Sequence, residues 1–143
     1  MEKERERAED LSYPSPIQPD KSSSDEDFNL ALKACMENLD HVRLVAGTHN
    51  ETSSSHLAQL MEQYKLQPSD HRVYFAQLYG MSDHISFNLS HLGYNVAKYV
   101  PYGPIREVIP YLIRRAEENS SVKGQTGREL GLIMKEIKRR KRI

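Results

Sequence analysis

Hydrophobic residues in this chain form short continuous runs that alternate with stretches of helical periodicity. The continuous runs lie at 42–47, 72–80 and 95–100, and such runs are typical of strands buried on both faces. Each is followed by a stretch in which apolar residues recur every three or four positions, as on one face of a helix. Strands that alternate with helices in this way predict parallel pairing through right-handed crossovers. The expected fold class is therefore α/β.

The three helices of this alternation have recognisable boundaries. The first includes residues 57–64. The second is expected to have Ser82 as its N-cap and Gly93 as its terminator. The third should begin near Pro104, and Pro110 predicts a kink or a restart within it.

Two further helices and a loop are expected before the first strand. The charged amino end, residues 1–11, has the spacing of a short solvated helix. Residues 12–27 contain three prolines and a run of serines, a composition that predicts a loop. A helix should then include Phe28 and end near Asn38, with Asp25 or a neighbouring serine as its cap.

Length and composition limit the possible classes of function. The chain has 143 residues, enough for one domain. Its 20 basic and 20 acidic residues cancel, so net charge favours neither a general nucleic-acid binder nor an anionic surface protein. The single cysteine, Cys35, excludes an internal disulfide and fits a reducing compartment. The amino end has no apolar run of the kind that a signal peptide or a membrane span requires.

Candidate chemistry lies where the expected strands end, because the carboxyl ends of parallel strands build the sites of α/β proteins. Thr48 and His49 follow the first strand, Leu78 lies at the end of the second, and Tyr99 lies at the end of the third. His49 also fits an ordinary role, satisfied by the backbone or placed beside the helix cap Asn50, so its role stays open. The six histidines have no ligand spacing with carboxylates or the thiol, and no metal is expected.

The helix after the third strand carries two stripes. One is apolar and is expected to pack on the sheet; it comprises Ile105, Val108, Ile109, Leu112 and Ala116. The other borders it and comprises Tyr111, Arg114, Arg115 and Glu118. Spacing alone allows two readings of the second stripe. It is either a solvated face with an Arg114–Glu118 pair, or a carboxylate clamp in which two guanidinium groups lie beside an aromatic wall.

Several segments resemble the carboxyl-terminal part of the proline dehydrogenase family, in that family's order and spacing. The segments are THNE (Thr48–Glu51), DHRVYFAQLYGM (Asp70–Met81), KYVPYGPIREVIPYLIRRAEENSS (Lys98–Ser121) and, more weakly, YPSPIQP (Tyr13–Pro19). The resemblance implies that residues 1–143 form part of one distorted (β/α)8 barrel, covering its strands six to eight. It also implies FAD-dependent oxidation of L-proline to 1-pyrroline-5-carboxylate, with quinone as the final electron acceptor.

The resemblance also implies roles for individual residues. Arg114 and Arg115 would bind the proline carboxylate, while Tyr99 and Tyr111 would line the substrate pocket. Leu78 would place an apolar surface near the proline ring. The protein would then position the substrate, and the cofactor would carry out the redox chemistry.

The same resemblance assigns residues to the flavin side. Thr48 and His49 would contact the FAD from the exit of strand six. Glu118 would help to hold the arginine and flavin region in place.

The chain departs from the family at its front. The family takes a carboxylate-binding lysine, an aspartate and a flavin-side arginine from strands that precede anything in this sequence. Strands one to five are therefore expected to be missing, and three strands cannot close an eight-stranded barrel. The isolated chain is expected to be inactive, whether it is a truncated product, a sequencing fragment or half of a split enzyme. Asp20 also departs from the pattern, because a smaller or uncharged residue is expected in that loop.

The basic tail, residues 138–143, has its own alternatives. It could be a solvated helix end whose cations complement the helix dipole, or it could contact an anionic membrane surface. Nucleic acid is not an expected partner, because no second basic patch or aromatic platform accompanies the tail. The expected location is cytoplasmic, with peripheral contact at the inner membrane, in a bacterium, and mitochondrial in a eukaryote. The alternative function is a small α/β module that binds a carboxylate or phosphate ligand without catalysis.

Overall fold

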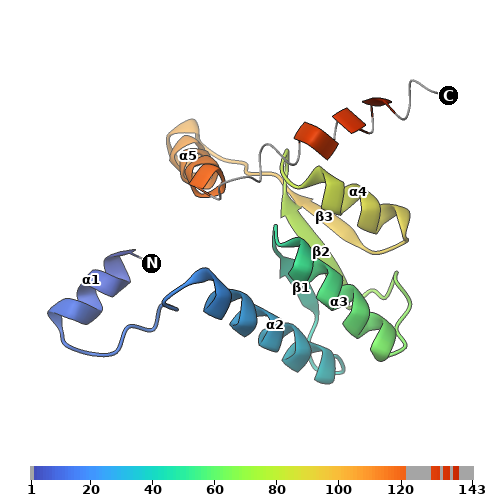
Figure 1. Ribbon diagram of the computed structural model, residues 1–143, viewed down its shortest axis with the longest axis horizontal. Coiled ribbons are helices and arrows are strands. Elements are labelled where there is room, and N and C mark those ends of the chain that lie inside the picture. The colour runs from blue at the N-terminus through green and yellow to red at the C-terminus, as the bar shows by residue number, and fades with distance from the viewer. Residues whose placement is uncertain (1, 122–129, 133, 136, 139–143) are drawn as a thin grey trace. The chain divides into compact units, whose positions relative to one another are not determined.

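The computed structural model describes residues 2–121, 130–132, 134–135 and 137–138. The chain divides into two compact units, one formed by residues 1–44 and 50–67 and the other by residues 45–49 and 68–143. Along the chain the elements alternate as β1, α3, β2, α4, β3 and α5 after two leading helices (Figure 1). The α/β class expected from the hydrophobic pattern is confirmed.

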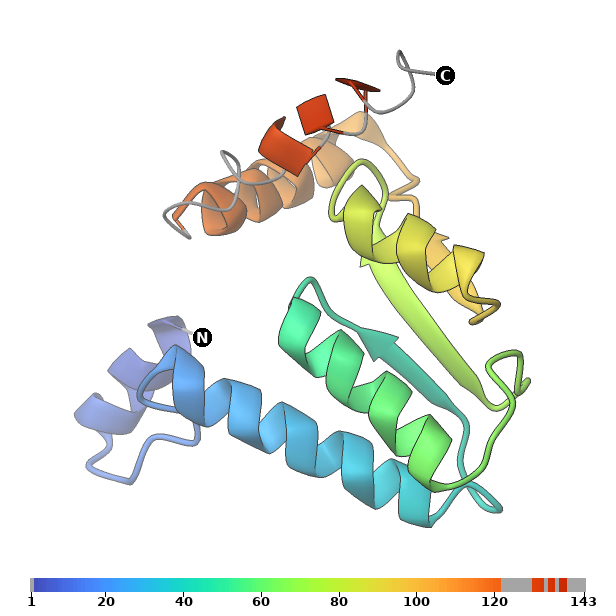
Figure 2. The ribbon, with the colours of Figure 1, turned by 45° about the vertical axis from the view of Figure 1, so that its right-hand side comes forward.

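The first unit is helical. It consists of α1 (Glu2–Asp10), α2 (Lys21–Glu37) and α3 (Glu51–Gln63). Helices α2 and α3 lie side by side in both ribbon views (Figures 1 and 2). Their buried apolar residues are Leu32 and Met36 on α2, and Leu57, Leu60 and Met61 on α3. Helix α1 is mostly exposed, as expected, although Ala8 is buried.

The start of α2 corrects the expected loop at 12–27. The helix begins at Lys21, so the serine run lies in its first turns, and neither Asp25 nor a serine is the cap. Asp20 is the N-cap, and its carboxylate accepts a hydrogen bond of 2.8 Å from the backbone N–H of Ser23. That bond lowers the pKa of Asp20 and satisfies one of the free donors of the first turn. The residue that departs from the family pattern therefore has a local structural role.

The second unit contains the sheet, whose strand order is β1-β2-β3. The strands are β1 (Leu44–Gly47), β2 (Val73–Leu78) and β3 (Val96–Tyr99). Strands β2 and β3 are parallel, and Leu78 is the register partner of Tyr99. Helix α4 (Asp83–His91) contacts both of these strands. Within this unit, Phe75 is fully buried and its ring meets that of Tyr94 edge to face at 5.4 Å between centroids.

Helix α5 (Ile105–Ser121) bears on two expectations. It continues through Pro110, which excludes the restart and leaves the kink as a prediction, and the backbone N–H groups of Glu107 and Val108 donate to the carbonyl of Pro104 at its start. The stripe expected to pack on the sheet is largely exposed: Ile105 is 78% exposed and Ile109 is 47% exposed. Periodicity identifies the side chains that share a face, but burial also requires a surface to cover that face. In the described part of the chain, a ring contact at the end of β3 joins α5 to the sheet.

No helix in the described residues is both long enough and apolar enough to cross a bilayer. The predicted basic tail lies mostly outside the described residues, since of residues 138–143 only Lys138 is included, in a helical segment.

An ion pair fixes the turn that leads into β2. Arg72 donates from Nε and Nη2 to the two carboxylate oxygens of Asp70, at 3.0 and 2.8 Å. The backbone N–H of Arg72 also donates to Asp70, and these hydrogen bonds lower the pKa of Asp70 to about 2. The Asp70 carbonyl accepts from the side-chain amide of Asn95, which precedes β3. The turn therefore ties the start of β2 to the start of β3.

Replacing Asp70 with Asn should lower the free energy of unfolding in a pH-dependent way. Because folding lowers the pKa of Asp70 from 3.8, its stabilising contribution is full above the unfolded value and disappears as the pH falls through the folded value. The difference between the two proteins should stay constant down to about pH 5 and vanish between about pH 4 and pH 2. Urea unfolding followed by circular dichroism at each pH measures it. Glu62→Gln, at an exposed position, is the control, and an Asp70→Asn difference that persists unchanged at pH 2 would contradict the assignment.

Candidate functional site

The predicted site residues at the strand ends are brought together at one end of the sheet. Leu78 and Tyr99 are adjacent through the parallel register, and the backbone N–H of Tyr79 donates to the Tyr99 carbonyl at 2.9 Å. Thr48 follows β1, and its N–H donates to the Ala76 carbonyl in β2. Leu78 is buried, Thr48 is half-buried and Tyr99 is exposed. The sheet therefore presents a polar, an apolar and an aromatic residue along one edge, in strand order.

An aromatic and cationic stack joins α5 to this edge. The ring of Tyr111 meets the ring of Tyr99 edge to face, with centroids 6.2 Å apart and planes at 84°. The guanidinium carbon of Arg115 lies 5.5 Å from the Tyr111 centroid, within the range of a cation–π interaction. Tyr111 and Arg115 are both half-buried. The stack holds the Arg115 guanidinium group over the Tyr111 ring, which in turn meets the Tyr99 ring at the carboxyl end of β3.

The other predicted residues of α5 are placed less fully. Arg114 is exposed. Glu118 belongs to α5, but its side chain lies outside the described part of the chain. Of the two arginines of the predicted clamp, the structure therefore places Arg115 at the aromatic pair. Carboxylate binding by Arg114 and the supporting role of Glu118 stay predictions.

His49 is tied to the next strand exit by a side-chain hydrogen bond. Its Nδ1 lies 2.8 Å from the hydroxyl oxygen of Ser82. Ser82 does occupy the N-cap position of α4, as expected, but its side chain makes no capping bond. Its backbone is left-handed, with φ 50° and ψ 41°, a conformation that costs a non-glycine residue about 1–3 kcal/mol. The Ser82 hydroxyl therefore forms a hydrogen bond with His49 instead of the capping bond that was expected.

Three buried polar residues lie behind this edge, and none of them is among the predicted site residues. Gln77, Ser82 and Ser86 are each no more than 3% exposed. The side-chain amide of Gln77 donates to the Thr48 carbonyl at 3.2 Å, and the Ser86 hydroxyl donates to the Gln77 side-chain oxygen at 2.9 Å. The signal in the sequence was a glutamine inside an otherwise apolar strand, since a buried amide requires partners.

Lys98, which lies in β3, also holds the loop between β2 and α4 in place. Its ammonium group donates to the Met81 carbonyl at 2.7 Å and to the Asp83 carboxylate at 2.8 Å. The same loop contains Gly80 at φ 77°, a backbone conformation that glycine adopts at little cost. Residues from all three strand exits thus converge on this loop.

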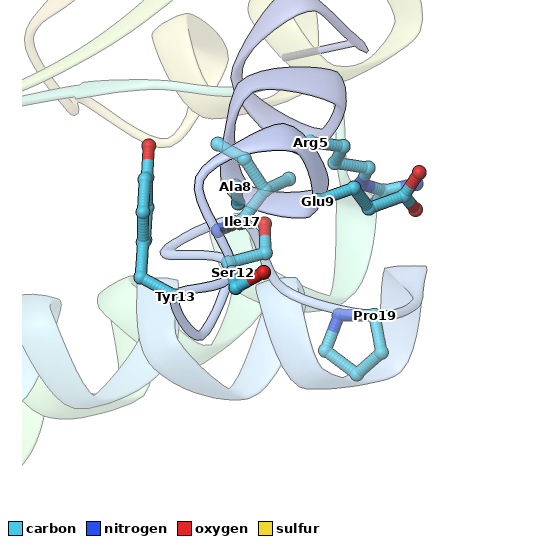
Figure 3. A pocket seen from close by; sticks show the side chains of 8 residues that line it. Arg5, Ala8, Glu9, Ser12, Tyr13, Ile17 and Pro19 are labelled. Carbon is cyan, nitrogen blue, oxygen red and sulfur yellow. Dashed lines mark hydrogen bonds between the residues drawn. The ribbon is translucent and has the colours of Figure 1, made fainter.

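A separate hollow lies in the first unit and contains none of the predicted site residues. It has a volume of about 460 Å³ and is lined by Arg5, Ala8, Glu9, Ser12, Tyr13, Ser15, Ile17 and Pro19. Figure 3 shows these side chains around the end of α1 and the following loop. Arg5 donates to the Gln18 carbonyl at 2.7 Å and Tyr13 donates to Glu4 at 2.7 Å. These hydrogen bonds stabilise the loop after α1. The candidate functional site therefore remains the one at the strand ends. No cluster of three potential metal ligands occurs in the described residues either.

Gln77→Leu should lower the free energy of unfolding by about 1–3 kcal/mol, because it removes the two buried hydrogen bonds that the amide makes, to the Thr48 carbonyl and with the Ser86 hydroxyl. Gln59→Leu, at an exposed position on α3, is the matched control and should change stability little. Urea unfolding of the two variants measures the contrast. Equal effects at the two positions would show that the buried amide does not hold the strand ends together.

Comparisons with known proteins agree with this architecture. The family model described as proline dehydrogenase matches residues 1–128. Human "Proline dehydrogenase 1, mitochondrial" is 44% identical over 145 residues, which cover 99% of this chain and 24% of the human protein. Bovine "Hydroxyproline dehydrogenase" is 39% identical and is matched over 98% of this chain and 31% of its own length. The chain thus spans about a quarter to a third of these curated relatives.

A solved structure shares the fold. The crystal structure of proline utilization A (PutA) from Bdellovibrio bacteriovorus inactivated by N-propargylglycine superposes with a TM-score of 0.76 at 28% sequence identity. The superposition covers 85% of this chain and 12% of the PutA chain. The expected partial barrel is thereby confirmed. A strand-end edge with an aromatic and cationic helix beside it, together with these matches, shows that the chain belongs to the proline dehydrogenase family of oxidoreductases.

Proposed function

We propose that this chain supplies the carboxylate clamp and one flavin-contacting edge for the FAD-dependent oxidation of L-proline to 1-pyrroline-5-carboxylate. The observation that carries the proposal is the stack of Arg115 on Tyr111 and of Tyr111 against Tyr99. A guanidinium group offers paired N–H donors that match a carboxylate. Within a family of proline dehydrogenases, this is the group suited to bind the anionic end of the substrate.

The aromatic residues have a positioning role. The edge-to-face contact with Tyr99 restrains Tyr111, and Tyr111 in turn restrains Arg115. Since a clamp that is already oriented loses less freedom on binding, this restraint favours tight and specific binding of the carboxylate. Arg114, one residue away and exposed, would provide the second guanidinium group, and Glu118 would steady the pair.

The residue types at the edge fit the proposed cofactor. Thr48 and His49 offer polar groups, and the neighbouring buried Leu78 offers an apolar surface. This combination suits a planar ring system with polar edges, and we propose that Thr48 and His49 contact it. When bound, FAD would supply the hydride acceptor for this two-electron oxidation, with Thr48 and His49 on its polar side. The chain's own residues then bind the carboxylate, orient the ring and cover its apolar side.

The partners and location follow from the family. We propose quinone as the acceptor of the electrons and the anionic surface of a membrane as the place of contact, with the basic tail at 138–143 as the candidate for that contact. The human relative is named as a mitochondrial protein, so a mitochondrial location is expected in a eukaryotic cell. In a bacterium the expectation is cytoplasmic, with peripheral contact at the inner membrane.

A chimera tests the function of the chain directly. Residues 1–143 replace the matching segment of human proline dehydrogenase 1, which supplies the remaining strands. The purified chimera should carry flavin, seen by absorbance, and should reduce a soluble quinone when proline is added. A folded chimera with bound flavin and no proline-dependent reduction would refute the proposed role, and would favour a ligand-binding module without catalysis.

Arg115→Met in that chimera should raise the KM for proline by about tenfold to a hundredfold, because it removes a charge-assisted hydrogen bond to the carboxylate. Flavin content should stay unchanged. Arg106→Met, at an exposed position on the same helix, is the control and should leave KM unchanged. Steady-state kinetics with varied proline separates the two, and an unaltered KM in Arg115→Met would exclude the carboxylate role.

A further inference from the structure

Ser82 and His49 lie 33 residues apart and leave different strands, yet their side chains share a hydrogen bond of 2.8 Å. His49 follows β1 and Ser82 precedes α4. The bond joins Nδ1 of the imidazole to the serine hydroxyl. A histidine whose Nδ1 is held in this way has a fixed ring orientation, which decides what its Nε2 can face.

The backbone at Ser82 is specialised for this bond. An N-cap serine ordinarily has an extended backbone and uses its hydroxyl to accept from the first turn. Here the residue is left-handed and its side chain makes no capping bond. Glycine would adopt that conformation at lower cost. The position therefore combines an unfavourable backbone with a hydroxyl directed to His49.

The position of the hydroxyl proton follows from burial. Ser82 is 3% exposed, and a buried hydroxyl requires an acceptor for its proton. Among the described residues, Nδ1 of His49 is the acceptor that the Ser82 hydroxyl reaches. The need for an acceptor favours the hydroxyl as the donor to Nδ1, and a neutral ring then carries its proton on Nε2.

The surroundings prevent Ser82 from moving away. Its carbonyl accepts from the backbone N–H groups of Ile85 and Ser86, at 3.0 and 3.1 Å. The carbonyl of the preceding residue, Met81, accepts from Lys98. Ser86 also donates to Gln77, which holds the Thr48 carbonyl next to His49. Both ends of the Ser82–His49 bond thus belong to one hydrogen-bonded frame, which is buried at Gln77, Ser82 and Ser86.

We infer that Ser82 is a positioning residue that holds His49 as the Nε2–H tautomer, so that the imidazole presents an N–H donor to an acceptor atom of the bound flavin. The inference rests on the proposed function for the identity of that acceptor. The bond between Ser82 and His49 stands on the geometry alone, and the tautomer is the part that the spectrum tests.

Nitrogen-15 NMR of the histidine rings in the full chain tests the tautomer. At neutral pH, His49 should show a single Nε2–H form with a hydrogen-bonded Nδ1, while the exposed His71 should show the averaged mixture of a solvated ring. Ser82→Gly, which suits the left-handed backbone, should shift His49 towards the His71 pattern, and Ser90→Ala on the exposed side of α4 should not. A wild-type spectrum with the proton on Nδ1, or one that matches His71, would overturn the inference whether or not the variant folds.

A double-mutant cycle in the chimera tests the link to the flavin. Ser82→Gly and His49→Ala should each weaken FAD binding by about fivefold to tenfold, the equivalent of one net hydrogen bond. The double variant should be no weaker than His49→Ala, because Ser82 acts through His49. Additive losses would overturn the positioning role. If His49→Ala leaves FAD affinity unchanged while NMR shows the expected tautomer, the proposed flavin contact of His49 is wrong and the Ser82–His49 bond stands.

Discussion

The strand-end site depends on the requirement that a buried amide find hydrogen-bond partners. Gln77 lies in the central strand at 2% exposure, where an unsatisfied side chain would be costly. It meets that requirement with the loop after β1 on one side and with helix α4 on the other. Because one residue bonds both neighbours, the positions of Thr48, His49 and the α4 terminus are set together.

In this arrangement, the residues that hold the site in place are different from most of those proposed to bind ligands. The buried glutamine and serines hold backbone carbonyls in place, while His49, Tyr111 and Arg115, which are proposed to touch ligands, lie half-buried at the rim. The tyrosine and arginine stack of α5 is built differently, from ring and cation contacts. The two parts of the site are thus held by different forces, and salt should affect them to different degrees.

Sequence periodicity identified the alternation of strands and helices, and the strand-end rule placed Thr48, Leu78 and Tyr99 at one edge, because both depend on local pattern and parallel topology. Prediction from the sequence failed for features that depend on residues distant in the chain. The Ser82 hydroxyl bonds His49, 33 residues away, and a local rule could only assign it to the nearest helix. The start of α2 was misplaced because Asp20 was assigned to a proline-rich loop, although its carboxylate reaches the first turn. The exposed stripe of α5 shows that periodicity gives a face, whereas burial depends on what lies opposite.

The strand order leaves β1 and β3 as the outer members of the three-stranded sheet. Each outer strand carries a row of backbone donors and acceptors on the side away from β2, and such rows readily pair with strands of other molecules. Apolar side chains such as Val45, at 62% exposure, lie on one of them. Within the described residues, these borders offer ready-made templates for strand addition.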